Sequence, residues 1–153
     1  MAVLRAAALT VVLSAAAFDA YGESSYEQLA RAYGASYGIL RYADNGANRC
    51  ATVPSGSTVA PNGKIVEWKG AARLREVARD CQRVSDSLNS RIRSAYPSRL
   101  PELEREMVRG AAELEADSRK FIEGAFRAKP GDAMMGCWIV EQAVVEAAAK
   151  NCR

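Results

Sequence analysis

Apolar residues recur every third or fourth position along four segments of the chain, which predicts four amphipathic helices. The expected helices cover residues 25–43, 67–96, 101–127 and 132–150. The clearest stripe lies in the second segment and contains Leu74, Val77, Cys81, Val84 and Leu88. Asn45-Gly46, Pro97 and Pro130-Gly131 are helix-ending signals between the segments. Because the later connections are short, the pattern favours an all-α antiparallel bundle of about four helices.

One long connection, residues 44–66, separates the first two predicted helices. It is rich in Gly, Pro, Ser, Thr and Asn, and its 23 residues exceed the usual length of a loop within a compact domain. Lys64-Ile65-Val66 follows the turn signal Asn62-Gly63 and could pair as a small hairpin, although Pro61 argues against it. Loops of this length are often functional or mobile.

The first 22 residues have the pattern of a secretory signal peptide. Arg5 precedes an apolar run from Ala6 to Phe18, and Ala20 and Gly22 suit a signal-peptidase site. Ala15 and Ala17 offer a second site. The run is shorter than the roughly 20 apolar residues that a membrane-spanning helix needs. We therefore expect cleavage, a single helical domain over 23–153, and export to the bacterial periplasm or beyond, with no membrane attachment afterwards.

Export changes the interpretation of the four cysteines, because an even number in an oxidising compartment indicates disulfides. Cys137 and Cys152 share one predicted helix at a spacing of about 22 Å, too far apart to bond each other. Two pairings remain: Cys50–Cys137 with Cys81–Cys152, or Cys50–Cys152 with Cys81–Cys137. The first is slightly favoured, because in an up-down bundle Cys50 lies near the start of the last helix.

Composition excludes several kinds of chemistry. The chain has no histidine, so Ser-His-Asp and Cys-His nucleophile pairs, imidazole zinc sites and histidine pH switches are absent. A net charge of +3 is too small to indicate nucleic-acid binding. No phosphate-binding, calcium-binding or hydrolase motif is present, and we predict no metal and no cofactor.

Two surface features are candidate partner-binding sites. Four arginines form one outward ridge on the second predicted helix: Arg75, Arg79, Arg83 and Arg93. This arginine ridge could dock an acidic protein, or it could simply be a solvated helix face. On the first predicted helix, Gly34 and Gly38 lie one turn apart beside Tyr33 and Tyr37. Because each mid-helix glycine costs about 1 kcal/mol relative to alanine, we predict a close contact there, with another helix or in a homodimer.

Glu141 falls on the apolar face of the last predicted helix and is the candidate buried acid. A buried carboxylate needs a partner such as an arginine. The residue is therefore an acid of raised pKa, half of a structural ion pair, or a carboxylate at the edge of that face and exposed at the surface. The favoured hypothesis is an exported, non-enzymatic protein-binding module of the inhibitor, immunity or secretion-accessory type. A small-molecule or lipid carrier, with a cavity near Met107 and Met134, is the alternative, and an enzyme built on Glu141 is a weaker one.

Overall fold

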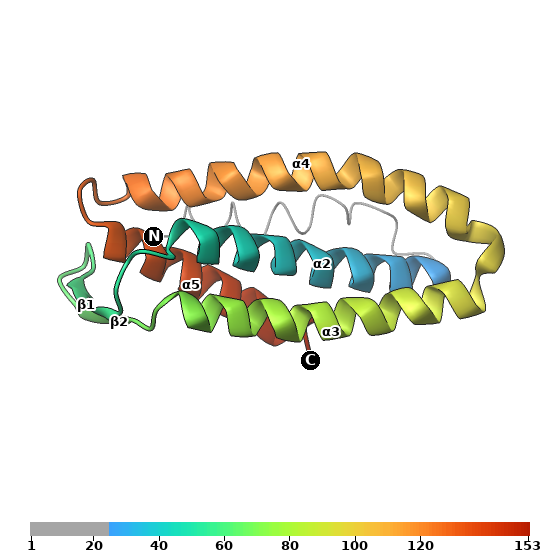
Figure 1. Ribbon diagram of the computed structural model, residues 1–153, viewed down its shortest axis with the longest axis horizontal. Helices are drawn as coiled ribbons and strands as arrows, with labels where there is room; N and C mark the ends of the chain where they lie inside the picture. The colour runs from blue at the N-terminus through green and yellow to red at the C-terminus, as the bar shows by residue number, and fades with distance from the viewer. Residues whose placement is uncertain (1–24) are drawn as a thin grey trace.

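The computed structural model describes residues 25–153, and the predicted signal peptide lies outside this range. Its helices are α2 (Ser25–Arg49), α3 (Ala71–Ala95), α4 (Leu100–Arg127) and α5 (Ala133–Asn151), with a short 3-10 turn, η2 (Pro97–Arg99), before α4. Two short strands, β1 (Gly56–Val59) and β2 (Ile65–Trp68), form an antiparallel hairpin between α2 and α3. Consecutive helices run in opposite directions, and the hairpin lies at one end of the bundle (Figure 1). The predicted disulfide-stapled helical bundle is confirmed.

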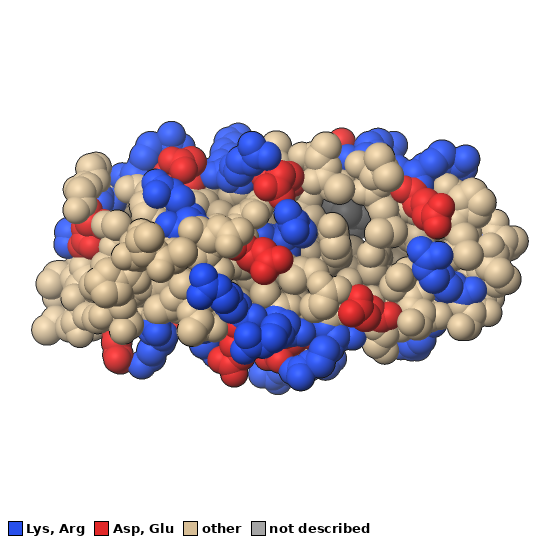
Figure 2. Space-filling model, viewed as in Figure 1, with Lys and Arg blue, Asp and Glu red and all other residues tan. Residues whose placement is uncertain are grey.

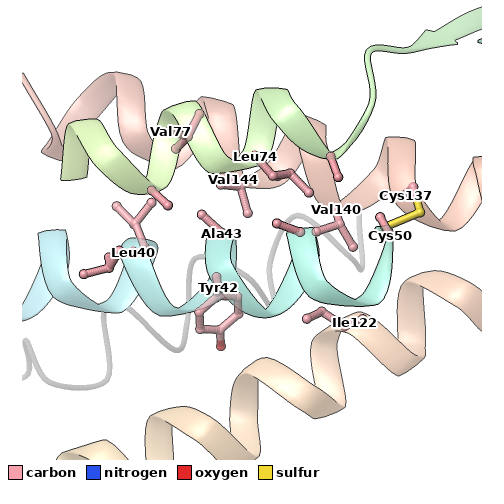
Figure 3. Close-up of a cluster of buried hydrophobic side chains, with 14 of the residues drawn as sticks. Leu40, Tyr42, Ala43, Cys50, Leu74, Val77, Ile122, Cys137, Val140 and Val144 are labelled. Carbon is pink, nitrogen blue, oxygen red and sulfur yellow. A yellow bond between two sulfur atoms is a disulfide. The ribbon is translucent and has the colours of Figure 1, made fainter. Parts of the chain in front are cut away.

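The larger of two hydrophobic clusters fills the half of the bundle that contains α5. We call this cluster the stapled core. Side chains from all four helices converge in it, as Figure 3 shows for Leu40, Leu74, Ile122 and Val140. Trp68 is fully buried at the base of the hairpin, and its indole nitrogen donates to the carbonyl of Val53. The hairpin is therefore packed onto the same core.

A smaller group, the tyrosine cluster, fills the other end of the bundle. Its buried members are Tyr26, Tyr33, Ile92 and Leu103, which come from α2, α3 and α4. No residue of α5 belongs to this cluster. The shortest helix, α5, therefore packs along only one half of the bundle, where it contacts the three longer helices.

All four cysteines are paired, and the favoured pairing is confirmed. Cys50 bonds Cys137 and Cys81 bonds Cys152, with Cα–Cα distances of 5.9 and 4.8 Å. No cysteine is free. Both bonds therefore attach α5 to earlier parts of the chain, one near its beginning and one just past its end.

The predicted end of the first helix at residue 43 is wrong, because α2 continues to Arg49. Asn45-Gly46 was expected to stop the helix, but both residues have tertiary roles inside it. The Asn45 amide donates to Glu115 and Ser118 of α4, and Gly46 is buried against Val140 and Leu74. These contacts outweigh the weak helix propensity of the two residues.

The predicted start of the second helix at residue 67 is also wrong. Residues 67 and 68 are the last two residues of β2, and α3 begins at Ala71. Gly70, with a φ of 96°, makes the turn between them, a conformation that favours glycine. The small hairpin that Lys64-Ile65-Val66 suggested is confirmed, because Pro61 lies in the turn, outside both strands. The predicted loop thus contains the last turn and a half of α2, a short turn region and a structured hairpin.

Candidate functional site

The arginine ridge lies on the outer face of α3. Leu74 and Cys81, at the centre of the apolar stripe of this helix, are fully buried, and the opposite face is exposed. Arg75, Arg79 and Arg83 follow one another at four-residue intervals on that face, and all three are exposed. Figure 2 shows a dense group of basic side chains at the lower margin of the molecule, where α3 lies in this view. The structure therefore brings these three arginines into one row.

The members of the ridge differ in their ion pairs. Arg83 pairs with Asp80, and Arg93 lies 3.6 Å from Glu104 of α4. Within residues 25–153, no ion pair or hydrogen bond is found for the side chains of Arg75 and Arg79. Since α3 carries six arginines and only three acidic residues, its surface keeps an excess of positive charge. The unpaired end of the row, at Arg75 and Arg79, is the part best able to attract an external carboxylate.

The surface around the ridge is polar. Gln82 and Asp86 bond each other beside the arginines at 2.7 Å, and Ser90 is exposed. No large exposed hydrophobic residue lies on α3. An interface on this face would therefore depend mainly on charge, which favours fast, salt-sensitive association over tight apolar packing.

The tyrosine and glycine residues of α2 do not form one surface. Tyr33 is buried, and its ring stacks on that of Tyr37 with centroids 6.0 Å apart. Burial raises the pKa of Tyr33, while a hydrogen bond to the Ser85 side chain opposes the shift. Both rings thus contribute to packing inside the bundle, which is the alternative to an interface role.

The two glycines of α2 have different surroundings. A Cβ added at Gly38 would lie 3.6 Å from the Leu114 side chain of α4, an ordinary packing distance. A Cβ at Gly34 would meet nothing within 4 Å among the described residues. An internal close contact therefore does not explain Gly34, and the homodimer hypothesis at this position stays a prediction.

Glu141 is buried, with 4% of its surface exposed. Its partner is a backbone group instead of the expected arginine, because the Lys69 amide donates to its carboxylate at 3.2 Å. Burial raises the pKa of Glu141, and the Lys69 amide and the charge of Arg73 oppose this. The carboxylate therefore fixes the turn that joins β2 to α3, a structural role.

A polar network between α2 and α4 was missed from the sequence. The Glu115 carboxylate accepts from Arg41 at 3.2 Å and from Asn45 at 3.1 Å, and Asn45 also reaches the buried Ser118. These bonds hold the pKa of Glu115 below its usual range, and the bond from Asn45 has the largest effect. Glu115 also forms an ion pair with Arg119, one turn further along α4, at 3.6 Å. The network fixes how α4 lies along α2.

Two close backbone approaches were also missed. A Cβ at Gly46 would lie 2.7 Å from a methyl group of Val140, and one at Gly136 would lie 2.8 Å from the Phe126 ring. Both distances are too short for a side chain, so glycine is needed where α2 meets α5 and where α4 meets α5. Helix spacing alone could not separate these glycines from Gly34, because the distinction lies in the neighbouring helix.

Comparison of the chain with protein-family models, with curated proteins and with solved structures gives no match. Within residues 25–153, no three His, Cys, Asp or Glu side chains are grouped so that they could hold a metal ion. None of the helices in the same range is long and apolar enough to cross a membrane. Function is therefore inferred from the chain's own surface.

Proposed function

We propose that this protein is an exported, non-enzymatic protein-binding module, of the inhibitor, immunity or secretion-accessory type, which binds an acidic partner through the arginine ridge. The observation that carries the proposal is the exposed pair Arg75 and Arg79, which lies on an ordered helix and has no acidic partner among the described residues. Each guanidinium presents several donors that match a carboxylate. An acidic protein surface supplies the missing charges.

The ridge is well suited to binding because its helix is held rigidly. Directly beneath Arg75 and Arg79, the side chains of Leu74, Val77 and Ala78 are buried in the stapled core. Cys81 attaches the same helix to the end of α5. A surface that is already ordered loses less conformational entropy on binding than a flexible one.

The two disulfides indicate an oxidising compartment. The sequence pattern of residues 1–22 narrows this to the bacterial periplasm or the exterior of the cell, after cleavage of the signal peptide. A secreted binding module of this size commonly uses disulfides to keep a small core stable.

Neither alternative function has a supporting observation of comparable strength. The carrier hypothesis needs a cavity near Met107 and Met134. Met134 instead packs against Gly56 of the hairpin, and Met107 packs on the tyrosine cluster. The enzyme hypothesis depends on Glu141, whose carboxylate already accepts the Lys69 amide.

The test compares two double charge reversals. In Arg75→Glu/Arg79→Glu the unpaired end of the ridge is reversed, and in the matched control Arg105→Glu/Arg109→Glu an exposed pair with the same four-residue spacing is reversed on α4. A partner captured from the protein's own compartment is identified, purified and titrated calorimetrically against each variant. We expect the ridge variant to bind at least about tenfold more weakly, a loss of about 1.4 kcal/mol, with a smaller salt dependence.

The control variant should bind as the wild type does, and thermal unfolding should show that both variants fold. Equal affinity of the ridge variant and the wild type would contradict the assignment of the ridge. A partner that binds with no dependence on salt would contradict the electrostatic basis of the proposal.

A further inference from the structure

The hairpin carries an exposed apolar pair. Val59 and Ile65 are 47% and 77% exposed, and with Val108 of α4 they are the exposed large hydrophobic residues of the described chain. They are directly opposite each other in the β1–β2 register, so their side chains share the outer face of the hairpin. The opposite face, with Thr58, Val66 and Trp68, is at least partly buried. The outer face is therefore apolar at the end of the hairpin and has no neighbour in the described structure.

The outer edge of β1 is already occupied. The Thr58 hydroxyl donates to Asp132 at 2.6 Å, and the Lys129 ammonium donates to the Val59 carbonyl at 3.1 Å. Asp132 also caps α5 by accepting from the Met135 amide. The segment between α4 and α5 thus lies beside β1, and Lys129 occupies the Val59 carbonyl that a strand added at that edge would need.

The outer edge of β2 is open next to the exposed pair. The Ala60 amide donates to the Lys64 carbonyl, so these residues form a hydrogen-bonded pair. Because pairs alternate along an antiparallel ladder, the backbone groups of Ile65 and Glu67 point away from β1. Among residues 25–153, no group outside the hairpin forms a hydrogen bond with the backbone of Ile65 or Glu67. The next amide that points outward, that of Lys69, already donates to the Glu141 carboxylate. An exposed row of this kind is a template on which another extended backbone can pair.

We propose that two copies of this chain associate through the outer edge of β2, with Ile65 of one copy facing Ile65 of the other across a twofold axis. In this antiparallel register the two isoleucines exchange both backbone hydrogen bonds. The Glu67 amide of each copy then faces the Gly63 carbonyl of the other. The hairpins join into one four-stranded sheet.

The side chains identify the second copy as the occupant. A strand added beside β2 places a side chain next to Ile65, and only an apolar one continues the exposed face. The twofold register supplies Ile65 itself and produces a continuous row of Val59, Ile65, Ile65 and Val59 from the two copies. Side chains directly opposite each other on neighbouring strands are in contact, so this row would bury apolar surface that each copy alone exposes.

The same geometry limits the assembly to a dimer. Because Lys129 and Asp132 occupy the edge of β1, the joined sheet has no open edge near the apolar row to which a third copy could add. The contact involves the hairpin ends alone, so its area falls in the class below about 1,200 Å² that forms weak, reversible complexes. This association is independent of the arginine ridge, which lies on α3.

Sedimentation equilibrium of the purified protein from about 10 µM to about 1 mM tests the proposal. We expect the average mass to rise with concentration towards twice the monomer mass. Ile65→Lys should remain a monomer over the whole range, while Val108→Lys, at a residue of the same 77% exposure on α4, should associate as the wild type does. Exchange of the Ile65 amide with solvent should become slower as the wild-type protein dimerises.

Three results would overturn the proposal. One is a wild-type protein that is monomeric at every concentration. Another is an association that Ile65→Lys retains, or that Val108→Lys abolishes. The third is dimerisation without any added protection of the Ile65 amide, which would place the contact elsewhere. If Ile65→Lys were to unfold, the exchange measurement on the wild-type protein would still decide between these results.

Discussion

The two ends of the bundle are held together in different ways. The stapled core contains residues from four helices, and two disulfides attach α5 to it. The tyrosine cluster has only α2, α3 and α4 and no covalent link. There Tyr26 packs edge-on against Tyr96 with centroids 5.4 Å apart, and the Arg99 guanidinium lies 4.1 Å from the centroid of the Tyr26 ring. One end thus depends on cross-links and close packing, and the other on aromatic contacts.

This difference explains where a binding surface can be rigid. Arg75, Arg79 and Arg83 lie over the stapled core, whereas Arg93 lies over the end that contains Ile92 of the tyrosine cluster. Regions with fewer buried apolar contacts open more easily than the rest of a protein. We therefore expect the first three arginines to keep a fixed geometry and Arg93 to be the more mobile member of the ridge.

Removal of a disulfide should have the largest effect and should act on one end only. We expect Cys50→Ala/Cys137→Ala to lower the free energy of unfolding by about 4 kcal/mol, because the bond closes a long loop with a sequence separation of 87 residues. Hydrogen exchange should show faster opening of α5 around Val140, with little change at Ile92. Equal loss of protection at both ends would show that the stapled core and the tyrosine cluster unfold as one unit, and that the disulfide does not stabilise one end selectively.

Two glycine substitutions should separate close packing from simple helix propensity. At Gly46 an added methyl group would lie 2.7 Å from Val140 in the stapled core, so we expect Gly46→Ala to destabilise the protein by about 1–3 kcal/mol. Gly34→Ala meets nothing within 4 Å among the described residues and should stabilise it by up to about 1 kcal/mol. Chemical denaturation measures both changes. A similar effect of the two substitutions would mean that α2 and α5 can move apart at little cost.

The sequence predicted the parts of this structure that depend on local pattern. The apolar stripes predicted the four helices, and Cys137 and Cys152 could not pair because the length of the last helix separates them. The expected starts of the last two helices, residues 101 and 132, are correct to within one residue, and Asp132 caps α5. The outward face of α3 followed from its inward stripe in the same way.

Contacts between distant segments could not be predicted. Asn45 and Gly46 carry a local stop signal, yet Glu115 and Val140 in other helices determine their conformation. Glu141 was expected to need a charged partner, but the turn after β2 brings it a backbone amide. The outer edge of β2 is open because Lys129 and Asp132 contact β1 and not β2. No periodicity in the sequence predicts which of the two strands they contact.

The smallest predicted effect concerns two tyrosine hydroxyls, one from each end. The Tyr42 hydroxyl is buried in the stapled core and has no hydrogen-bond partner among the described residues. We therefore expect Tyr42→Phe to leave the free energy of unfolding at neutral pH unchanged or raised by about 1 kcal/mol, because a buried unsatisfied group is removed. The matched control is Tyr33→Phe, which loses the hydrogen bond to Ser85 and should cost about 1 kcal/mol.

Alkaline pH should reveal the same difference. Burial, and then the charge of Asp117, raises the pKa of Tyr42 to about 12. An unfolded chain releases a tyrosine proton near pH 10, so between about pH 10 and 12 the folded state binds more protons and its stability falls as pH rises. Denaturation curves across this range should show a shallower fall for Tyr42→Phe than for the wild type. If the two slopes were equal, the Tyr42 hydroxyl would be accessible to water. The stapled core would then be open to solvent on its α4 side, and its tight packing would not distinguish it from the tyrosine cluster.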